Sequence, residues 1–289
     1  IELARRVNPG IEVIQLSATT GEGMDAWLHW LDHRMGHDHH HHHHDETHGS
    51  ETALRERVRP PTAQEMASIP WLDSLTPAER RHAEAALVVG EAEAGELICR
   101  IGRAPTYWFG LVDGLLKMGK DDAEGHSVTH SGLSAGGWFG EGTAMKREPY
   151  RYNITALRRS RVAGLPIDDF HWLLDHSIGF NRFVMNQLNE RLGQFIAARE
   201  IDRMSNPDLR VARTLAALVN PVLFPRVGEV LRITQQELAY LVGLSRQRVN
   251  EALRHLQAQG VIRIEYGGLR VLDLTALRQG LFGPARAAD

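Results

Sequence analysis

The chain has 289 residues, of which 43% are hydrophobic and 24% are charged, and its formal net charge at pH 7 is −3. This length accommodates two or three domains, and the composition is that of an ordinary globular protein. The slight acidity excludes a histone-like or polybasic protein, but it leaves room for a DNA-binding module whose basic face is offset elsewhere. The single cysteine, Cys99, excludes an internal disulfide, an all-cysteine zinc site and an Fe–S cluster held by four cysteines of this chain.

The chain opens with a segment, residues 1–34, that is too short to bury a core of its own. Residues 12–16 alternate like a short strand, residues 17–23 form a predicted turn, and residues 24–31 have helical spacing. Residues 35–62 hold almost no apolar side chains and are rich in His, Asp, Glu and Arg, which predicts a disordered linker.

A run of six histidines lies inside this linker and can chelate Ni²⁺ or Zn²⁺ through imidazole without selectivity. The run comprises His39, His40, His41, His42, His43 and His44. A metal tract in biological use, a passive linker and a purification tag all fit this pattern. We expect no metal site in the folded domains.

A sensor domain is predicted over residues 63–168. Thr76 and Glu79 have the spacing of a capping box at a helix start. From Val88 to Pro166, short alternating apolar runs are interrupted by glycines at close intervals, which predicts a compact β-roll or barrel. Cys99 lies in an apolar strand-like run, and we expect a small buried side chain there rather than a redox switch.

Residues 169–205 are predicted to contain a long helix, because the stretch from Ile178 to Met204 has no proline. An apolar stripe recurs along this stretch at helical spacing, and so long a helix needs a partner, most simply a parallel helix from a second subunit. The predicted dimerisation residues are Val184, Leu188, Leu192 and Phe195. The helix should end before Asn206, which can cap the next helix with Pro207 at its first position.

Residues 206–280 have the pattern of a winged helix-turn-helix, and residues 281–289 form a tail. The signals that delimit the two central helices are a capping box at Thr234 and Glu237, a tight turn at Gly243, an N-cap at Ser245 and a terminating Gly260. Residues 261–272 predict a β-hairpin, the wing. The expected fold class is therefore α+β, with a β-roll, a long helix and a winged helix-turn-helix.

The second of these helices carries a polar face suited to the major groove, where Arg pairs with guanine, Gln or Asn with adenine, and Glu with cytosine. Between Arg232 and Arg278, seven arginines stand against four acidic residues, a local balance of +3 that suits phosphate contact. The predicted DNA-binding residues are Thr234, Gln235, Ser245, Arg246, Gln247, Arg248, Asn250, Glu251 and Arg254. The alternative is a winged helix used for protein contact, with these residues as a solvated face.

The run Leu241-Val-Gly-Leu-Ser-Arg-Gln-Arg-Val-Asn250 resembles the helix-turn-helix of the Crp/Fnr transcription regulators, and the resemblance extends over about residues 63–278. It implies a cupin-like β-roll of the cyclic-nucleotide-binding type. It also implies a homodimer that binds a palindromic operator with half-sites about one helical turn apart. RNA polymerase is the implied further partner, and the resemblance indicates a regulator rather than an enzyme.

The recognition helix departs from the family pattern at two positions. The family usually reads DNA through an Arg-Glu pair and an Arg four residues after that Glu. Arg246 matches the first Arg, but Gln247 replaces the Glu, and Glu251 stands where the later Arg is expected. We therefore expect a half-site that differs from the best-known one of the family.

The resemblance also implies an effector pocket in the β-roll. In cyclic-nucleotide binders a Gly-Glu pair takes the ribose hydroxyl, and an Arg-Ser-Ala run ten residues later holds the phosphate. Here Glu141 and Arg151 match, but Tyr152 replaces the Ser. Phe195 and Ile196 stand where cyclic-AMP binders carry a polar pair that faces the base. These departures argue against cyclic AMP, so the effector and any cofactor stay unidentified.

Several interpretations of the sensor domain stay open. Glu141 and Arg151 form either a structural ion pair or part of a pocket for another anionic or aromatic ligand. Haem ligation is a further alternative, through one of five histidines: His82, His126, His130, His171 and His176. A regulator that does respond to cyclic nucleotides is the remaining one, and titration with cyclic AMP and cyclic GMP tests it.

Residues 13–28 resemble the end of the nickel-incorporation GTPases of hydrogenase and urease maturation, and this resemblance covers residues 1–31. The phosphate-binding loop G-x-x-x-x-G-K-S/T occurs nowhere in the chain, so we expect no GTPase activity. A metal-binding or GTPase-derived maturation protein with an appended domain is the alternative from another class. Deletion of residues 1–62 separates the two hypotheses, because a regulator should keep operator binding.

No stretch approaches the roughly 18 consecutive apolar residues of a membrane span, and no signal peptide opens the chain. We therefore expect a cytoplasmic protein with no membrane partner.

Overall fold

The computed structural model describes residues 57–121, 127–201, 205–227 and 230–280, together with Ile14, Ser17, Thr20, Gly23, Asp25 and Ala26. The chain divides into two compact units, Ile1–Thr47 and His48–Asp289. In the first unit, the Thr20 amide donates a hydrogen bond to Ser17 Oγ over 3.2 Å, and Gly23 has a φ of +80°. Both observations agree with the predicted turn at residues 17–23.

Several predictions for the ends of the chain lie outside the described residues. They concern the rest of the strand at residues 12–16, most of the helix at 24–31, the histidine run at 39–44 and the tail at 281–289.

Three short helices lead into the β-roll of the second unit. They are α4 (Ala63–Ala67), the 3-10 helix η2 (Pro70–Ser74) and α5 (Pro77–Ala86). Thr76 caps α5 with the predicted capping box, because its side chain accepts from the Glu79 amide while the Glu79 carboxylate accepts from the Thr76 amide. The predicted capping box therefore marks the start of α5, and Ser177 Oγ also donates to Glu79 Oε2 at 2.8 Å.

Backbone pairing with the β-roll begins at Arg59, before residue 63, the predicted start of the sensor domain. The backbone of Arg59 pairs with that of Val89, with N–O distances of 2.9 and 2.7 Å, and the Arg59 guanidinium meets the Glu65 carboxylate at 2.7 Å. The predicted disordered linker, residues 35–62, is therefore wrong at its C-terminal end. These pairings depend on residues outside the segment itself, so the composition of the segment does not show them.

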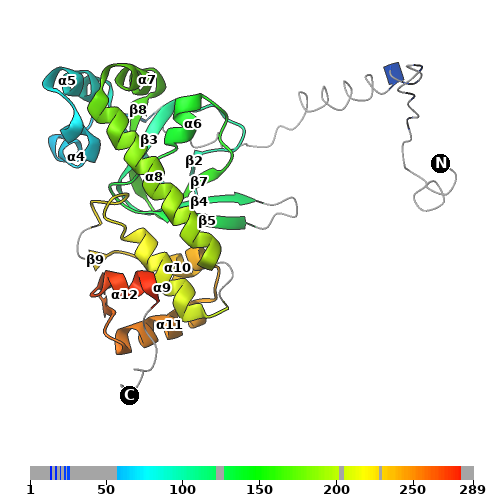
Figure 1. Cartoon of the computed structure of the whole chain (residues 1–289), viewed down its shortest axis with the longest axis vertical. Helices are drawn as coiled ribbons and strands as arrows, with labels where there is room; N and C mark the ends of the chain where they lie inside the picture. The colour runs from blue at the N-terminus through cyan, green and yellow to red at the C-terminus, as the bar shows by residue number, and fades with distance from the viewer. Residues whose placement is uncertain are drawn as a thin grey trace. The chain divides into compact units, whose positions relative to one another are not determined.

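The predicted β-roll consists of two four-stranded antiparallel sheets, ordered β1-β8-β3-β6 and β2-β7-β4-β5 (Figure 1). The strands are β1 (Val88–Ala92), β2 (Leu97–Cys99), β3 (Tyr107–Asp113), β4 (Leu116–Asp121), β5 (Ser127–Leu133), β6 (Trp138–Phe139), β7 (Asn153–Ala156) and β8 (Ser160–Pro166). The short helix α6 (Glu141–Lys146) follows β6. The roll begins and ends at the residues expected from the glycine-interrupted pattern.

Two apolar cores support the roll. The core between the sheets includes Cys99, which is fully buried as predicted. The second core contains Trp71, Trp108 and Trp138, whose ring centroids lie 5.5, 5.2 and 4.5 Å apart in pairs. Gly110 leaves space for this cluster, because a Cβ at that position would lie 2.2 Å from the Trp138 ring.

Helices α7 (Ile167–His176) and α8 (Ile178–Ile201) follow the roll. Ser177 starts α8, because its hydroxyl accepts a hydrogen bond from the Phe180 amide at 3.1 Å. Figure 1 shows α8 running from the end that holds α5 and α7, past the sheets, to the C-terminal helices. The long helix predicted from Ile178 is therefore present.

The apolar stripe of α8 faces two ways. Val184 is 2% exposed and packs into the tryptophan-containing core of the same chain, which corrects its predicted place at a dimer interface. Leu188 is partly buried against the same core, and its place at a dimer interface stays a prediction. By contrast, 59% of Leu192 and 49% of Phe195 are exposed. Three further exposed apolar residues on this helix are Ile178, Met185 and Ile196.

The C-terminal part is the predicted winged helix-turn-helix. Its elements are α9 (Pro207–Leu218), β9 (Val230–Leu231), α10 (Gln235–Val242), α11 (Arg246–Ala258), β10 (Ile262–Glu265), β11 (Gly268–Val271) and α12 (Leu274–Gln279). Asn206 caps α9, because its Oδ1 accepts from the Asp208 amide at 2.9 Å. The wing sheet has the order β10-β11-β9, so it contains one strand more than the predicted hairpin.

Throughout the described ranges, no helix is both long enough and apolar enough to cross a membrane.

Candidate nucleic-acid interface and sensor interior

Local sequence signals fix the geometry of α10 and α11. Thr234 Oγ1 accepts from the Glu237 amide at 3.1 Å, and Glu237 Oε2 accepts from the Thr234 amide at 2.8 Å. Gly243 ends α10 with a φ of +72°, a left-handed conformation that favours glycine. Ser245 then caps α11 by accepting from the Arg248 amide at 3.3 Å. The turn between the helices is therefore the one expected from the sequence.

The second helix of this pair, α11, presents a polar face to solvent. Its opposite face, which includes Val249, Leu253 and Leu256, is buried in the core of the winged helix. The predicted DNA-binding residues that are exposed are Thr234, Ser245, Arg246, Gln247, Arg248, Glu251 and Arg254. Three arginines and an amide on one free helical face match the hydrogen-bonding pattern of base edges in the major groove.

Two hydrogen bonds orient polar side chains at this interface. Asn250 is half-buried, and its Oδ1 accepts from Gln235 Nε2 at 3.1 Å, which ties α11 to the start of α10. Gln247 Nε2 donates to Glu251 Oε1 at 3.3 Å across one helical turn. The two positions that depart from the family pattern are therefore joined by a hydrogen bond.

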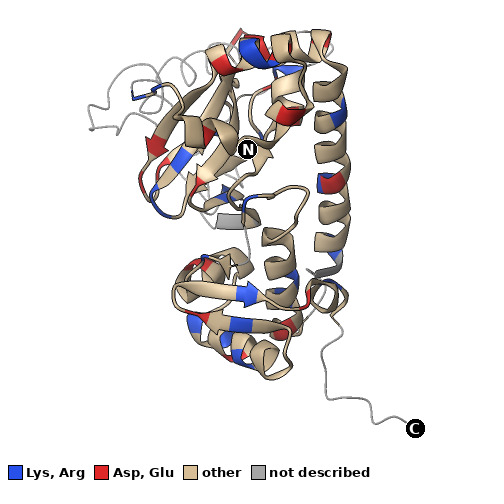
Figure 2. Ribbon diagram, turned by 90° about the vertical axis from the view of Figure 1, so that its left-hand side faces the viewer, with Lys and Arg blue, Asp and Glu red and all other residues tan. Residues whose placement is uncertain are grey.

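The wing adds basic side chains next to α11. Arg263 and Arg270 both donate to Glu265 Oε1, with Nε–O distances of 3.1 and 2.9 Å. The hydrogen bond from Arg270, followed by that from Arg263, lowers the pKa of Glu265. Tyr266 at the tip of the wing is fully exposed. Figure 2 shows Lys and Arg positions on the wing strands and on the neighbouring helix, in agreement with the local positive balance.

Inside the β-roll, Glu141 is a buried charge with only 1% of its surface exposed. Gly140, with a φ of +80°, precedes α6 and places Glu141 as the first residue of that helix. Arg191 on α8 donates from Nε to Glu141 Oε1 at 2.8 Å and from Nη2 to the Trp138 carbonyl. The second carboxylate oxygen, Oε2, has no hydrogen-bond partner among the described residues. A buried acceptor of this kind suits a ligand that offers a hydroxyl or N–H group.

The structure contradicts one of the two alternatives for Glu141 and Arg151, the structural ion pair. Arg151 has 81% of its side chain exposed and pairs with Glu148 at 3.2 Å. Arg191, the actual partner, is absent from the sequence-based set of pocket residues. One sequence signal does mark it, because it lies seven residues after Val184 and so falls on the buried face of the long helix.

Tyr152 lies inside the roll next to Glu141. Its hydroxyl is 3.6 Å from the point that a Cβ on Gly140 would occupy. Burial raises the pKa of Tyr152 to about 12, and the negative charge of Glu141 acts in the same direction, while a hydrogen bond with Thr143 opposes both. The ring therefore enters the interior of the roll as a neutral phenol.

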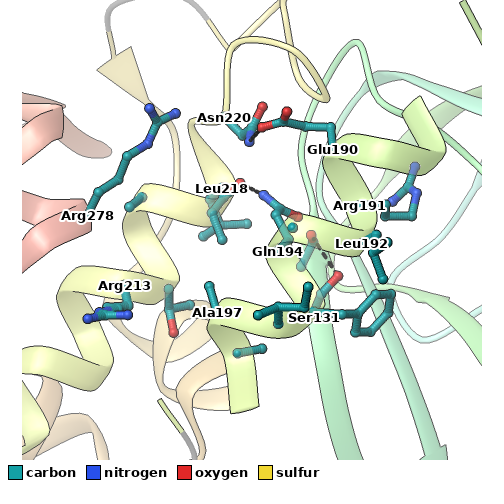
Figure 3. Close-up of a pocket in the computed structure, with 18 of the residues that line it drawn as sticks. Ser131, Glu190, Arg191, Leu192, Gln194, Ala197, Arg213, Leu218, Asn220 and Arg278 are labelled. Atoms are coloured by element: carbon teal, nitrogen blue, oxygen red, sulfur yellow. Dashed lines mark hydrogen bonds between the residues drawn. The ribbon is translucent and has the colours of Figure 1, made fainter. Parts of the chain in front are cut away.

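Phe195 and Ile196 lie elsewhere, at a cavity of about 560 Å³ that is shown in Figure 3. The lining of this cavity includes neither Glu141 nor Tyr152. The five residues predicted to form one effector pocket therefore occupy three places: the interior of the roll, the surface at Arg151, and this cavity.

Polar contacts between α8 and the chain at and after α9 close one side of the cavity. Gln194 Nε2 donates to the Ala217 carbonyl at 3.3 Å, and Asn220 Nδ2 donates to Glu190 Oε1 at 2.8 Å. Figure 3 shows Glu190 and Asn220 pointing toward each other. The long helix is thus joined directly to the first helix of the winged domain.

Three histidines considered for haem ligation have other partners. His82 Nε2 lies 2.8 Å from Asp169, and His171 Nε2 lies 2.9 Å from the Ala144 carbonyl. His82 and His176 each stack on Trp172, with ring centroids 3.8 and 4.3 Å apart. The side chains of His126 and His130 lie outside the described residues.

Two family models match the chain: the cyclic nucleotide-binding domain over residues 90–177 and the Crp-like helix-turn-helix domain over residues 209–279. The chain is similar to the transcriptional regulator SdrP of Thermus thermophilus, with 30% identity over 174 residues, which cover 58% of this chain and 81% of SdrP. Among solved structures, FixK2 of Bradyrhizobium japonicum has a similar fold, with a TM-score of 0.55 and 16% identity, covering 69% of this chain and 98% of FixK2.

A separate segment of 32 residues is 66% identical to the hydrogenase maturation factor HypB of Escherichia coli. This agrees with the resemblance of residues 1–31 to nickel-incorporation GTPases. The segment spans 11% of HypB, so the similarity does not extend to a whole maturation factor.

Proposed function

Because the chain belongs to the Crp/Fnr family of transcription regulators, we propose that it binds a palindromic operator as a homodimer, with one α11 in the major groove of each half-site. RNA polymerase is the proposed partner of the DNA-bound dimer. The observation that carries this proposal is the exposed polar face of α11. The N-caps at Thr234 and Ser245 fix where α10 and α11 begin. The positive balance of the winged helix supports contact with phosphates.

Exposed apolar side chains on α8 support the homodimer. Met185, Leu192 and Ile196 are each about 60% exposed and recur at steps of seven and four residues. A helix 24 residues long with such a face gains stability when a second helix covers it. The second α8 of a dimer is the simplest such helix, and it would set the distance between the two α11 helices.

We propose that the effector is not a cyclic nucleotide. A cyclic phosphate needs a positive partner and a hydroxyl inside the roll, but Arg151 points to solvent and pairs with Glu148. The position of the expected Ser is taken by Tyr152, a half-buried residue whose ring packs against the core between the sheets. Among the described residues of the roll, Glu141 Oε2 is a buried acceptor that stays available for an effector.

Operator selection tests the DNA-binding proposal. Wild-type protein should enrich a palindromic sequence from a randomised duplex library. Arg246→Ala should lower the affinity for that sequence by about tenfold or more and relax the preference at one base of each half-site. Gln247→Ala should change the preference at a neighbouring base, because its amide is the group placed to read an edge there.

Arg81→Ala serves as the matched control, because Arg81 is an exposed arginine on α5 in the sensor domain. Its selected sequence should be that of the wild type. Unchanged base preferences in both α11 variants would contradict the assignment of α11 as the reading helix.

A further inference from the structure

Arg158 connects the sensor domain to the first helix of the helix-turn-helix. It lies in the turn between β7 and β8, at the edge of the roll. Its Nη1 donates to both oxygens of Glu237, at 3.2 and 3.0 Å, and its Nη2 donates to the Arg232 carbonyl at 2.9 Å. One guanidinium therefore contacts the winged helix through both a carboxylate and the backbone.

The carboxylate in this pair has a second role at the start of α10. Glu237 Oε2 also accepts from the Thr234 amide at 2.8 Å, as part of the capping box. Thr234 and Gln235 are among the predicted DNA-binding residues, and the N-terminus of a helix attracts phosphate through its free amides. A negative carboxylate at that end opposes the attraction, and the positive charge of Arg158 offsets it.

Apolar contacts surround this pair and reduce its exposure to water. Leu115 is buried in the same core as the helices of the winged domain, and Leu157 packs against that core, although both belong to the roll. Gly132 allows α9 to approach β5 closely, because a Cβ on this residue would lie 2.6 Å from a methyl of Leu218. The side chain of Glu237 is only 13% exposed, so its charge is poorly screened by solvent.

We propose that Arg158 is a positioning residue for operator binding: it holds the winged helix on the β-roll in one orientation and neutralises Glu237 beside the phosphate-facing end of α10. This inference rests on the proposed operator binding. The contact leaves the reading face of α11 exposed, so it orients that face rather than covering it. A change in the roll that moves the β7–β8 turn would reach α10 through Arg158.

Four variants of the full chain test the proposal against an operator duplex enriched by the wild-type protein. Arg158→Ala should weaken binding by about fivefold to tenfold, at the lower end of the usual range of coupling between sites. Arg159→Ala should leave binding unchanged, because this neighbouring arginine pairs with Glu91 and Glu93 of the sensor domain. Fluorescence anisotropy measures both affinities.

Glu237→Gln separates neutralisation from direct DNA contact. The amide keeps an acceptor for the Thr234 amide and removes the negative charge. Glu237→Gln alone should bind within about twofold of the wild type, because Arg158 can still donate to the Arg232 carbonyl. The double variant of Arg158→Ala with Glu237→Gln should bind more tightly than Arg158→Ala, because it regains the part of the affinity lost to the uncompensated charge. If Arg158 instead contacted phosphate directly, the double variant would bind as weakly as Arg158→Ala, and the proposal would be overturned.

Amide hydrogen exchange without DNA gives an independent measurement. Residues 230–242, which contain β9 and α10, should exchange faster in Arg158→Ala than in Arg159→Ala, because only the first variant frees the start of α10. Equal exchange in the two variants would overturn the proposal even if operator binding were established. Failure of the wild type to enrich any operator would refute the proposed function instead, and the exchange experiment would still distinguish the two ideas.

Discussion

Two buried carboxylates of the sensor domain, Glu65 and Glu141, are paired with arginine to different degrees. Both oxygens of Glu65 are satisfied: Arg59 donates at 2.7 and 2.9 Å, and Arg161 donates at 3.2 Å. Glu141 has Arg191 on one oxygen, and its other oxygen has no hydrogen-bond partner within the described ranges. Because buried polar atoms are normally satisfied, the first site is structural, whereas the second has the unfilled capacity of a binding site.

The Glu65 site predicts a specific response to acid. The hydrogen bond from Arg59, the largest cause, lowers the pKa of Glu65 from 4.5 to about 2. A lowered folded-state pKa contributes stability that is fully present above pH 4.5 and is lost as the pH falls toward 2. Glu65→Gln should therefore lower the free energy of unfolding at pH 7 by about 3 kcal/mol and flatten its decline between about pH 5 and pH 2.

Urea unfolding at a series of pH values measures this effect. Glu93→Gln is the control, because Glu93 has 59% of its side chain exposed and lies 3.7 Å from Arg159, a surface pair worth at most about 1 kcal/mol. An acid profile of Glu65→Gln that superimposes on that of the wild type would show that Arg59 does not stabilise the charged form.

At the scale of elements, α8 combines a buried face and an exposed one, and a pair of substitutions separates them. Leu192→Asp should convert the proposed dimer to monomer with little effect on the fold, because it places a charge on the exposed face. Val184→Ala should instead lower the free energy of unfolding by about 2 kcal/mol and leave the dimer intact, because Val184 packs into the core of its own chain.

Sedimentation equilibrium and thermal unfolding provide the two measurements. The assignment of the faces fails if Val184→Ala dissociates the protein or if Leu192→Asp sediments as a dimer. Because the proposed dimer would bind two operator half-sites as a pair, the monomeric variant should also lose most of its operator affinity.

The elements that sequence predicts here are those whose ends are decided within a few residues. Thr76, Thr234 and Ser245 each mark a helix start, because a cap and its partner amide are separated by only three positions. β9 is different: Val230 and Leu231 are a strand only because they pair with β11. No local sequence pattern predicts so short a strand.

The candidate site also has a part that the sequence predicts and a part that it does not. The polar face of α11 follows from helical periodicity, so its exposed residues are predictable from the sequence. The partner of Glu141 is not, because Arg191 lies 50 positions away and Arg151 only ten. Choosing between them requires the packing of α8 against α6. The same holds for Arg158, whose carboxylate partner is 79 positions distant.

At the scale of the whole molecule, the segment after α9 packs into the sensor domain and ties it to the DNA-binding part. The segment after α9 places Leu223 and Phe224 in the core between the sheets of the roll. Arg226 then donates to the carbonyls of Ala67 and Ser68 at the end of α4, at 2.7 and 3.2 Å. Residues 206–280 are therefore not a self-contained body, because on their own they would expose these two apolar side chains to water.

This interlocking predicts how far the N-terminal part can be removed. A chain that begins at residue 57 should keep the stability and operator affinity of the full chain, because it retains the pairing of Arg59 with Val89 and Glu65.

A chain that begins at residue 63 loses that pairing and the Thr62 cap of α4, and it leaves Glu65 with Arg161 as its remaining arginine. Because Arg59 has 43% of its side chain exposed and Arg161 remains on Glu65, the loss should stay below the roughly 3–5 kcal/mol of a fully buried pair, but the shorter chain should still unfold at a lower temperature. Thermal unfolding and operator anisotropy on both chains measure the difference. Loss of operator binding on removal of residues 1–56 alone would show instead that the segment similar to maturation GTPases takes part in regulation.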